Sequence, residues 1–382
     1  MPVRDPSPPD ALPGSAVPCG ASALDPLPEP GARRPSATIA RALLRRLPLV
    51  GTLLGLGLAV WLVATNDLGA VASAFGRIGV LGLAAVVLTR VVIILLCGLA
   101  WARLLDGISR AGSGAFLVLR FVREGINVLL PVASVGGDVV GGRLLTFWGV
   151  TGALAAASIL ADLLIQAGTQ ALFALLGAVL LTQMAGDAAA ALSGWVLRAL
   201  AVAGVALVAF FSLQRLGAIR MIERRLANLG RRFVREADPD PAGPHAVPAS
   251  ASVQDALDAV WGRGRLGHVL QSILLHLLAW AIGAAEIAIV LACIGVEGVT
   301  LAEVLVIEAL AQAIKSAAFP IPSGLGVQEG GFVVVGALFG IDAGTAIALS
   351  LAKRVPDVVL GLPALLVWQN LEARRTALAP PA

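Results

Sequence analysis

Two apolar segments, residues 115–149 and 303–341, carry charged and amide side chains beside Pro and Gly residues. Where Pro and Gly interrupt a helix, the second half begins with free N–H groups and a positive dipole end, which suit a phosphate or another anion. Glycines also let the backbone approach a ligand closely. The candidate ligand-binding residues are Glu124, Asn127, Gly136, Gly137, Asp138 and Arg143 in the first segment, and Lys315, Ser323, Gly324, Gly326, Gln328 and Glu329 in the second.

The composition indicates that these residues belong to a membrane protein. Hydrophobic residues make up 58% of the chain and charged residues only 14%, whereas a soluble domain carries roughly 25% charged residues. Such a chain cannot cover itself with polar surface, so lipid must be the solvent for much of it. No basic patch with interleaved aromatic residues occurs, and a nucleic acid partner is therefore not expected.

The sequence offers no pattern for a metal, a nucleotide or a catalytic nucleophile. Cys19, Cys97 and Cys293 are scattered, and His268 lies eight residues before His276, too far for the two to share one metal ion. No P-loop or GxSxG motif is present, and no GxGxxG sequence follows a predicted strand. Ser323 is better interpreted as a helix cap than as a nucleophile. We therefore expect no cofactor, no metal and no catalytic residues, and the chain is not expected to be an enzyme.

The intramembrane charges have two interpretations. Each costs ~2.5–3.5 kcal/mol on insertion scales, so such residues pair with one another or face a polar cavity. Their clustering in symmetric positions favours a cavity for the set, although for any single residue a structural ion pair is an equally good interpretation. Asp162, Arg354 and Asp357 are the candidates for buried ion pairs. Lys353, Arg354 and Asp357 could instead be interfacial, reaching from a helix end to the membrane surface.

Six apolar runs are long enough to cross a bilayer, which needs ~20 residues. These runs are residues 47–65, 78–101, 152–183, 195–213, 266–295 and 344–369. Each half of the two interrupted segments has ~15 residues, too few to span the bilayer. The predicted fold class is an all-α polytopic membrane protein with about six full transmembrane helices and two broken, re-entrant helical hairpins.

The arginine distribution predicts one topology. The segment 214–265 and the flank before the first apolar run are rich in Arg, which places both in the cytoplasm. If each broken segment enters and leaves on one side, the turns 184–194 and 296–302, which lack Lys and Arg, lie outside. Arg374 and Arg375 then end inside. Both termini are therefore expected in the cytoplasm.

The two interrupted segments form an internal repeat. Pro131 and Pro322 are each followed by an acid seven residues later and by a Gly eighteen residues later. An odd number of crossings separates the copies, so the repeat is inverted in the membrane. Inverted repeats with broken helices are typical of transporters, whose substrate site lies near the repeat interface. The alternative is that the Pro and Gly residues are ordinary kinks in two helical hairpins.

The predicted domains follow from these features. A central transmembrane domain spans residues 45–375. The further divisions are a disordered Pro-rich cytoplasmic tail over 1–38, repeat 1 over about 78–183, a basic cytoplasmic loop over 214–265, repeat 2 over about 266–370, and a C-terminal tail over 376–382.

The two motifs resemble a known membrane family. The segment from Arg123 to Arg143, REGINVLLPVASVGGDVVGGR, and the segment PIPSGLGVQEGG over 320–331 resemble the flippase-like family that includes the transmembrane region of lysylphosphatidylglycerol synthases. The closing RVPDVVLGLPALLVWQNLE over 354–372 looks most like the branch associated with hopanoid biosynthesis. The resemblance covers roughly residues 45–375. It implies a protein of the bacterial cytoplasmic membrane that moves a lipid or a lipid-linked headgroup between leaflets.

The resemblance leaves three functions open. The first is a lipid transporter for a hopanoid or another polar-headed lipid, in which the candidate residues contact the headgroup or exchange protons. The second is a membrane accessory protein or enzyme of lipid biosynthesis, acting with biosynthetic partner proteins. The third is a structural scaffold. The chain ends about a dozen residues after its last predicted helix, without the soluble transferase domain of the synthases, so it is not expected to make an aminoacyl lipid by itself.

Overall fold

The computed structural model describes residues 68–130, 135–184, 187–216, 252–318 and 321–374, together with Gly57 and Trp61. Several predictions fall on other parts of the chain. The Pro-rich tail over 1–38, most of the predicted span over 47–65, most of the basic loop over 214–265 and the tail over 376–382 lie outside the described residues.

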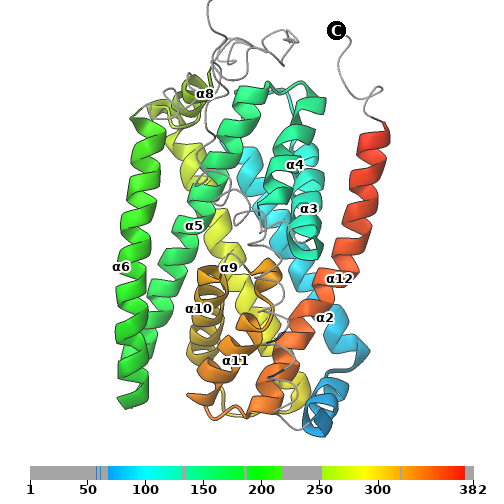
Figure 1. Cartoon of the computed structure of the whole chain (residues 1–382), viewed down its shortest axis with the longest axis vertical. Coiled ribbons are helices and arrows are strands. Elements are labelled where there is room, and N and C mark those ends of the chain that lie inside the picture. The colour runs from blue at the N-terminus through cyan, green and yellow to red at the C-terminus, as the bar shows by residue number, and fades with distance from the viewer. Residues whose placement is uncertain are drawn as a thin grey trace, which may run out of the picture. The chain divides into compact units, whose positions relative to one another are not determined.

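Long helices make up most of the described chain (Figure 1). Four are long and apolar enough to cross a membrane: α2 (Leu68–Leu105), α5 (Gly152–Thr182), α6 (Asp187–Arg215) and α9 (Leu266–Ile294). The helix α12 (Ala343–Ala373) has the same length as α5, 31 residues, but carries several charges. These helices match five of the six predicted spans, and the all-helical membrane fold class is confirmed.

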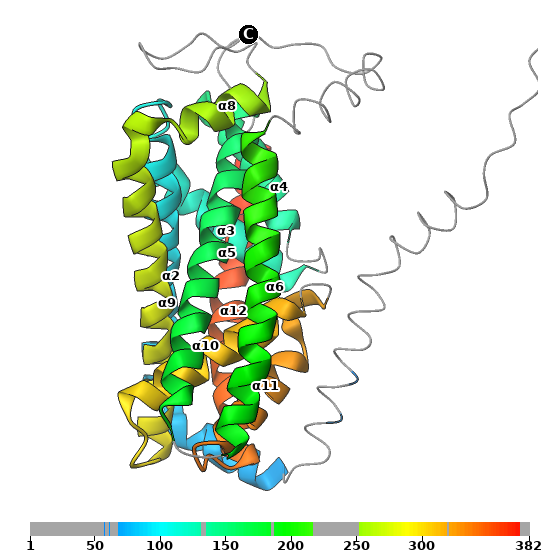
Figure 2. The same ribbon diagram turned by 90° about the vertical axis from the view of Figure 1, so that its left-hand side faces the viewer.

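The two interrupted segments form helical hairpins, as predicted. The first consists of α3 (Ser113–Leu129) and α4 (Gly136–Leu145), and a short 3-10 helix, η1 (Thr146–Trp148), follows it. The second consists of α10 (Leu301–Ala317), η3 (Pro322–Gly324) and α11 (Val327–Ala337). The hairpins occupy opposite halves of the helical bundle in both views (Figures 1 and 2). At about 1.5 Å per residue, α4 and α11 are ~15 Å long, half of the ~30 Å hydrocarbon core.

Contacts at the open end of the first hairpin fix its direction. Arg265 lies in the 3-10 helix η2 (Arg263–Arg265), which precedes α9. Its side chain donates to the carbonyl oxygen of Asp106 at 2.7 Å, and Asp106 directly follows α2 in the segment that leads to α3. Arg143, near the end of α4, pairs with Glu372 near the end of α12 at 2.8 Å. The start of α3 and the end of α4 therefore lie at the same end of the bundle.

The two repeats share backbone geometry as well as sequence pattern. Gly152 and Ala343, which begin α5 and α12, are 191 residues apart, as are Pro131 and Pro322. Gly149 and Gly340 both adopt left-handed conformations, with φ of 75° and 72°. Thr151 and Asp342 then cap the next helices, each accepting a hydrogen bond from the third N–H of its helix. Equivalent signals therefore start and stop equivalent elements.

The helix breaks follow from local backbone chemistry. Leu130, which precedes Pro131, is extended with φ of −100° and ψ of 144°, because a residue before proline avoids the helical region. In the second hairpin Gly324 and Gly326 have φ of 58° and 74°, conformations that glycine adopts without strain. Ser323 shares this left-handed conformation with φ of 55°, which is uncommon for a residue with a side chain.

Each hairpin has its own apolar core. Trp101, Phe116 and Leu145 belong to a buried cluster around α3, α4 and the first half of α5. Ile307, Phe332 and Leu349 belong to a second cluster around α10, α11 and the first half of α12.

We expect Gly125, where α3 packs closely on α12, to tolerate no added side-chain atom. A Cβ atom added at Gly125 would lie 2.5 Å from the Cβ of Ala364 and 3.1 Å from the carbonyl oxygen of Gly361. Gly125→Ala should therefore lower stability by about 1–3 kcal/mol, the cost of overpacking. Thermal unfolding in detergent measures the change.

Gly168→Ala is the matched control, because a Cβ atom there meets nothing within 4 Å. Alanine should leave stability unchanged or raise it by up to ~1 kcal/mol through helix propensity. Equal melting temperatures for Gly125→Ala and Gly168→Ala would contradict the close packing of α3 on α12.

Candidate functional site

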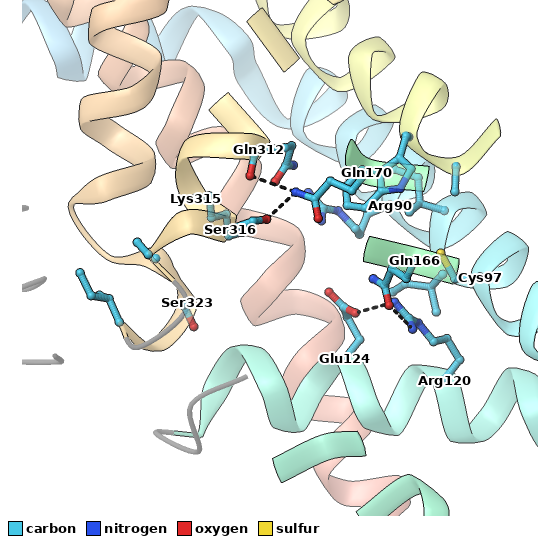
Figure 3. Close-up of a pocket in the computed structure, with 17 residues that line it drawn as sticks. Arg90, Cys97, Arg120, Glu124, Gln166, Gln170, Gln312, Lys315, Ser316 and Ser323 are labelled. Atoms are coloured by element: carbon cyan, nitrogen blue, oxygen red, sulfur yellow. Dashed lines mark hydrogen bonds and ion pairs between the residues drawn. The ribbon is translucent and has the colours of Figure 1, made fainter. Parts of the chain in front are cut away.

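A cavity of about 360 Å³ lies between the tips of the two hairpins, with α2, α5 and α9 forming the rest of its wall (Figure 3). The tips touch across the cavity, because the hydroxyl of Ser323 donates to the carbonyl oxygen of Val128. The polar lining residues are Arg90, Arg120, Glu124, Gln166, Gln170, Trp280, Gln312, Lys315, Ser316 and Ser323.

Four of the residues predicted from sequence line this cavity. Glu124 comes from α3, Lys315 from α10, and Ser323 and Gly324 from the turn before α11. The stem of Lys315 packs against the turn, since a Cβ atom at Gly324 would lie 2.8 Å from the Cγ of Lys315. The structure thus brings these parts of the two repeats to one place.

Arg120 is a buried cation in the cavity wall. Its guanidinium lies 3.5 Å from Glu124 and 3.7 Å from Asp162, and it donates to Gln166 at 3.4 Å. Arg120 shares a helix face with Glu124, and it is only 6% exposed. All three contacts are long, so the guanidinium group of Arg120 is loosely held.

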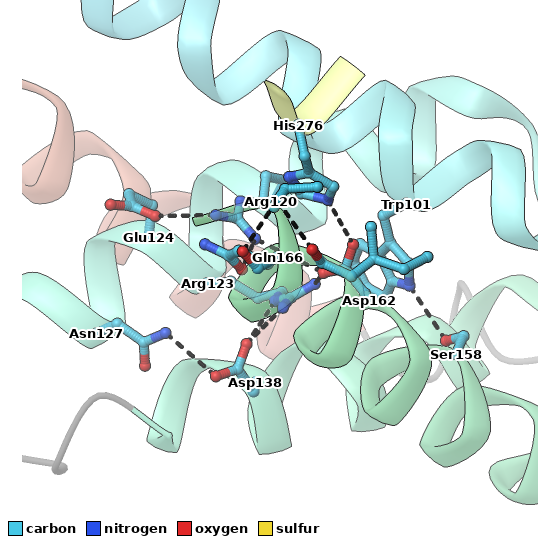
Figure 4. Close-up of polar contacts among 12 residues, drawn as sticks. Trp101, Arg120, Arg123, Glu124, Asn127, Asp138, Ser158, Asp162, Gln166 and His276 are labelled. Atoms are coloured by element: carbon cyan, nitrogen blue, oxygen red, sulfur yellow. Dashed lines mark hydrogen bonds and ion pairs between the residues drawn. The ribbon is translucent and has the colours of Figure 1, made fainter. Parts of the chain in front are cut away.

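A first group of buried charges, the Asp162 cluster, fastens the first hairpin to α5 and α9 (Figure 4). Its members are Arg120, Arg123, Asp138, Asp162 and His276. Arg123 bridges Asp138 at 2.5 Å and Asp162 at 2.9 Å, and His276 lies 3.2 Å from Asp162. The guanidinium of Arg123 also stacks 4.6 Å from the ring centre of Trp101. Arg123 therefore joins both legs of the hairpin to the long helix behind it.

A second group, the Lys353 cluster, fastens the second hairpin. Its members are Arg90, Glu286, Glu308 and Lys353. Lys353 lies 2.8 Å from both Glu286 and Glu308. Arg90 forms a two-pronged pair with Glu286, at 2.9 and 2.8 Å. Lys353 is only 3% exposed, so it is an internal ion-pair partner and not an interfacial residue.

The two clusters occupy equivalent places in the repeat. Asp162 on α5 and Lys353 on α12 are 191 residues apart, the spacing of the repeat. Asp162 binds a partner on α3, whereas Lys353 binds one on α10. The central charge has opposite sign in the two copies, while its position and structural task are the same.

Several predicted residues lie inside the hairpins instead of lining the cavity. Glu329 pairs with Arg354 at 2.6 Å and accepts from Ser350, whose hydroxyl also accepts from Gln328. Asn127 accepts from the backbone N–H of Gly137 at 2.8 Å. The first turns of α4 and α11, where anion binding is predicted, hold their own carboxylates, Asp138 and Glu329.

The remaining predicted residues lie at the edges of the site. Arg143 is half-exposed and pairs with Glu372. Asp357 lines a much smaller cavity that adjoins the first and shares Arg90 and Glu124 with it. Asp357 forms no ion pair within the described part of the chain, whereas Asp162 and Arg354 do. Gly136 begins α4 and Gly326 precedes α11, so both belong to the hairpin turns.

Sequence reasoning did not assign Arg90, Gln166, Gln170 or Trp280 to the site. They lie within long apolar runs that predict ordinary membrane spans. Arg90 carries the one signal that could have found it, because a single charge inside an apolar span needs a partner. That partner is Glu286, which is also a single charge within its span.

One comparison decides the family. The model of the lysylphosphatidylglycerol synthase TM region matches residues 49–364. The chain belongs to this family. The match includes both hairpins and the cavity between them. No curated protein and no solved structure matches the chain.

Family membership makes the chain a multi-pass membrane protein related to lipids. Over the residues that the structure describes, no three His, Cys, Asp or Glu side chains are grouped to hold a metal ion. The chemical resources of the cavity are therefore hydrogen bonds, from its amides and hydroxyls, and the charges of Arg90, Arg120, Glu124 and Lys315.

We expect Arg123 to be essential for stability. Removing one partner of a buried ion pair leaves an uncompensated charge, which costs about 3–5 kcal/mol. Arg123→Met should therefore lower the unfolding free energy by that amount, because Asp138 and Asp162 both lose their closest cation. Thermal unfolding of the purified protein provides the measurement.

Arg143→Met removes an arginine from an exposed pair and is the matched control. It should change stability by no more than about 1 kcal/mol, because exposed pairs contribute little. An Arg123→Met protein as stable as Arg143→Met would show that the Asp162 cluster does not hold the hairpin.

Proposed function

We propose that this protein moves a polar-headed lipid between the two leaflets, with the headgroup in the cavity and the tails in the bilayer. The observation that carries the proposal is the position of the cavity, between the tips of two inverted hairpins. The proposed location is the bacterial cytoplasmic membrane, with both termini in the cytoplasm.

The depth of the cavity supports the proposal. Each hairpin reaches only part of the way through the bundle, from opposite ends, and the tips meet at Ser323 and Val128. Broken backbone at this depth is tolerated where it packs in protein or lines a watery cavity. A site that two opposed hairpins enclose is placed to open towards either side, as inverted-repeat transporters do.

The lining of the cavity suits a headgroup. Three amide side chains, Gln166, Gln170 and Gln312, offer donors and acceptors beside the charged residues. The volume of about 360 Å³ lies within the ~300–1,000 Å³ that small-molecule sites occupy. A headgroup here exchanges hydrogen bonds with water for hydrogen bonds with protein, which lowers the cost of leaving water.

The described arginines support the proposed orientation. Arg103 lies in the last turn of α2 and Arg110 lies between α2 and α3, whereas Arg263 and Arg265 precede α9, at the end of the bundle where α12 also ends. An excess of Arg marks the cytoplasmic side. The resemblance of residues 354–372 to the hopanoid-associated branch makes a hopanoid the first lipid to test.

A role in lipid biosynthesis is the second candidate, because Glu124 places a carboxylate in the same cavity. It would hold a lipid for modification by this chain or a partner protein. A deletion strain separates the two functions. Transport predicts a normal hopanoid total with an altered leaflet distribution, whereas a biosynthetic role predicts an accumulating precursor.

We expect a bulky side chain in the cavity to block lipid movement. Ala318 lines the cavity at the end of α10. Ala318→Trp should reduce transbilayer movement of a fluorescent lipid in sealed proteoliposomes at least several-fold, since tryptophan fills the headgroup space. Bleaching of the outer leaflet by a membrane-impermeant reductant measures the movement.

Ala156→Trp is the control, because Ala156 is exposed on α5 and does not line the cavity. It should move lipid as fast as the unchanged protein. If the unchanged protein moves no native lipid, hopanoids included, the proposed transport function is wrong.

A further inference from the structure

Lys315 differs from the other charged residues of the cavity because its side chain forms no ion pair or hydrogen bond within the described residues. Arg90 is held by Glu286, and Arg120 contacts Glu124 and Asp162. The second lysine of the chain, Lys353, contacts two carboxylates at 2.8 Å. Asp357 attracts the ammonium group of Lys315 but forms no ion pair with it.

Arg120 supplies an independent second observation. Its Nε atom is buried and has no hydrogen-bond partner among the residues that the structure describes. The side chain lines the same cavity and is more than nine-tenths buried. A buried donor on a charged group is costly to leave without a partner. Both walls of the cavity thus present a cation with unused hydrogen-bonding capacity.

The repeat shows that this cationic character is not symmetric. Glu124 and Lys315 are 191 residues apart, so they occupy equivalent places on the two hairpins with opposite charges. The charge of Glu124 already faces Arg120 at 3.5 Å. Lys315 has no ion-pair partner among the described residues, so its ammonium group is the cavity cation that a ligand can pair with on the side of the second hairpin.

We propose that Lys315 and Arg120 together bind the phosphate group of an anionic lipid headgroup. A guanidinium donates in a planar fork, and an ammonium supplies a compact charge, and both are common ligands of phosphate in proteins. This inference rests on the proposed function and narrows its substrate class from any polar-headed lipid to a lipid whose headgroup carries a phosphate. The experiments below distinguish failure of the phosphate site from failure of the transport function.

The test uses the reactivity of Lys315 in the full-length protein. The chain has only two lysines, and Lys353 is buried. An amine-acylating reagent should therefore label Lys315 faster than Lys353, as read by mass spectrometry of peptides. Dioleoylphosphatidic acid should slow labelling at Lys315 about tenfold or more, whereas dioleoylglycerol, with the same tails and no phosphate, should not.

Affinity measurements on variants complete the test. Lys315→Met keeps an unbranched stem against Gly324 and removes the charge. It should reduce the preference for phosphatidic acid over diacylglycerol about tenfold to a hundredfold, the value of a charge-assisted contact. Lys315→Arg should retain the preference. Arg103→Met, which removes an exposed arginine that pairs with Asp106, should not change it.

The outcomes are distinct. Equal binding of the two lipids, or equal effects of Lys315→Met and Arg103→Met, would overturn the phosphate site. Labelling of the unchanged protein decides the question even if Lys315→Met does not fold. If inorganic phosphate alone protects Lys315 and phosphatidic acid does not, the site binds free phosphate and the lipid assignment is wrong. Phosphate-dependent protection without lipid movement in liposomes would sustain the site and refute transport. Lipid movement without a phosphate preference would sustain transport and refute the site.

Discussion

A charged side chain within a membrane must find a partner of opposite charge or water, and the broken helices of this protein depend on that requirement. A hairpin that turns back halfway gives up the continuous hydrogen-bond ladder of a spanning helix. Here the turns are held by ion pairs that join each hairpin to the long helix behind it. Arg123 ties α3 and α4 to α5, and Lys353 ties α12 to α9 and α10.

The pairing also separates structural charges from those available to a ligand. Asp138 pairs with Arg123 inside the first hairpin and Glu329 pairs with Arg354 on α12, so neither carboxylate is free to meet a substrate. Glu124 and Lys315 instead line the cavity. The repeat preserves the positions of the charges and reverses their sign at two places, between Glu124 and Lys315 and between Asp162 and Lys353. An inverted repeat can therefore build a symmetric scaffold around an asymmetric binding site.

Much of the fold is predictable from the sequence because its signals are local. Pro131, Pro322 and the glycines eighteen residues after them mark the breaks and turns without reference to distant contacts. The predicted span over 152–183 ends within one residue of the end of α5, because local signals also set its boundaries. The site is less predictable, because its contacts join residues far apart in the chain. Arg90 meets Glu286 across 196 positions, and only the fold shows that Gln170 and Gln312 share a wall with Lys315.

If the two hairpin tips meet in mid-membrane around the path of the lipid, a disulfide that joins the tips should stop lipid movement. Val128→Cys and Ser323→Cys are introduced together, after replacement of Cys19, Cys97 and Cys293, and the oxidised protein is assayed in sealed liposomes. Gly82→Cys with the native Cys293 is the positive control, because their Cβ atoms would be 3.6 Å apart, within the range of a disulfide. We expect the tip cysteines to cross-link within one chain, lipid movement to stop, and reduction to restore it. A control pair that cross-links while the tip cysteines do not, or undiminished lipid movement in fully cross-linked protein, would show that the tips do not meet around the path of the lipid.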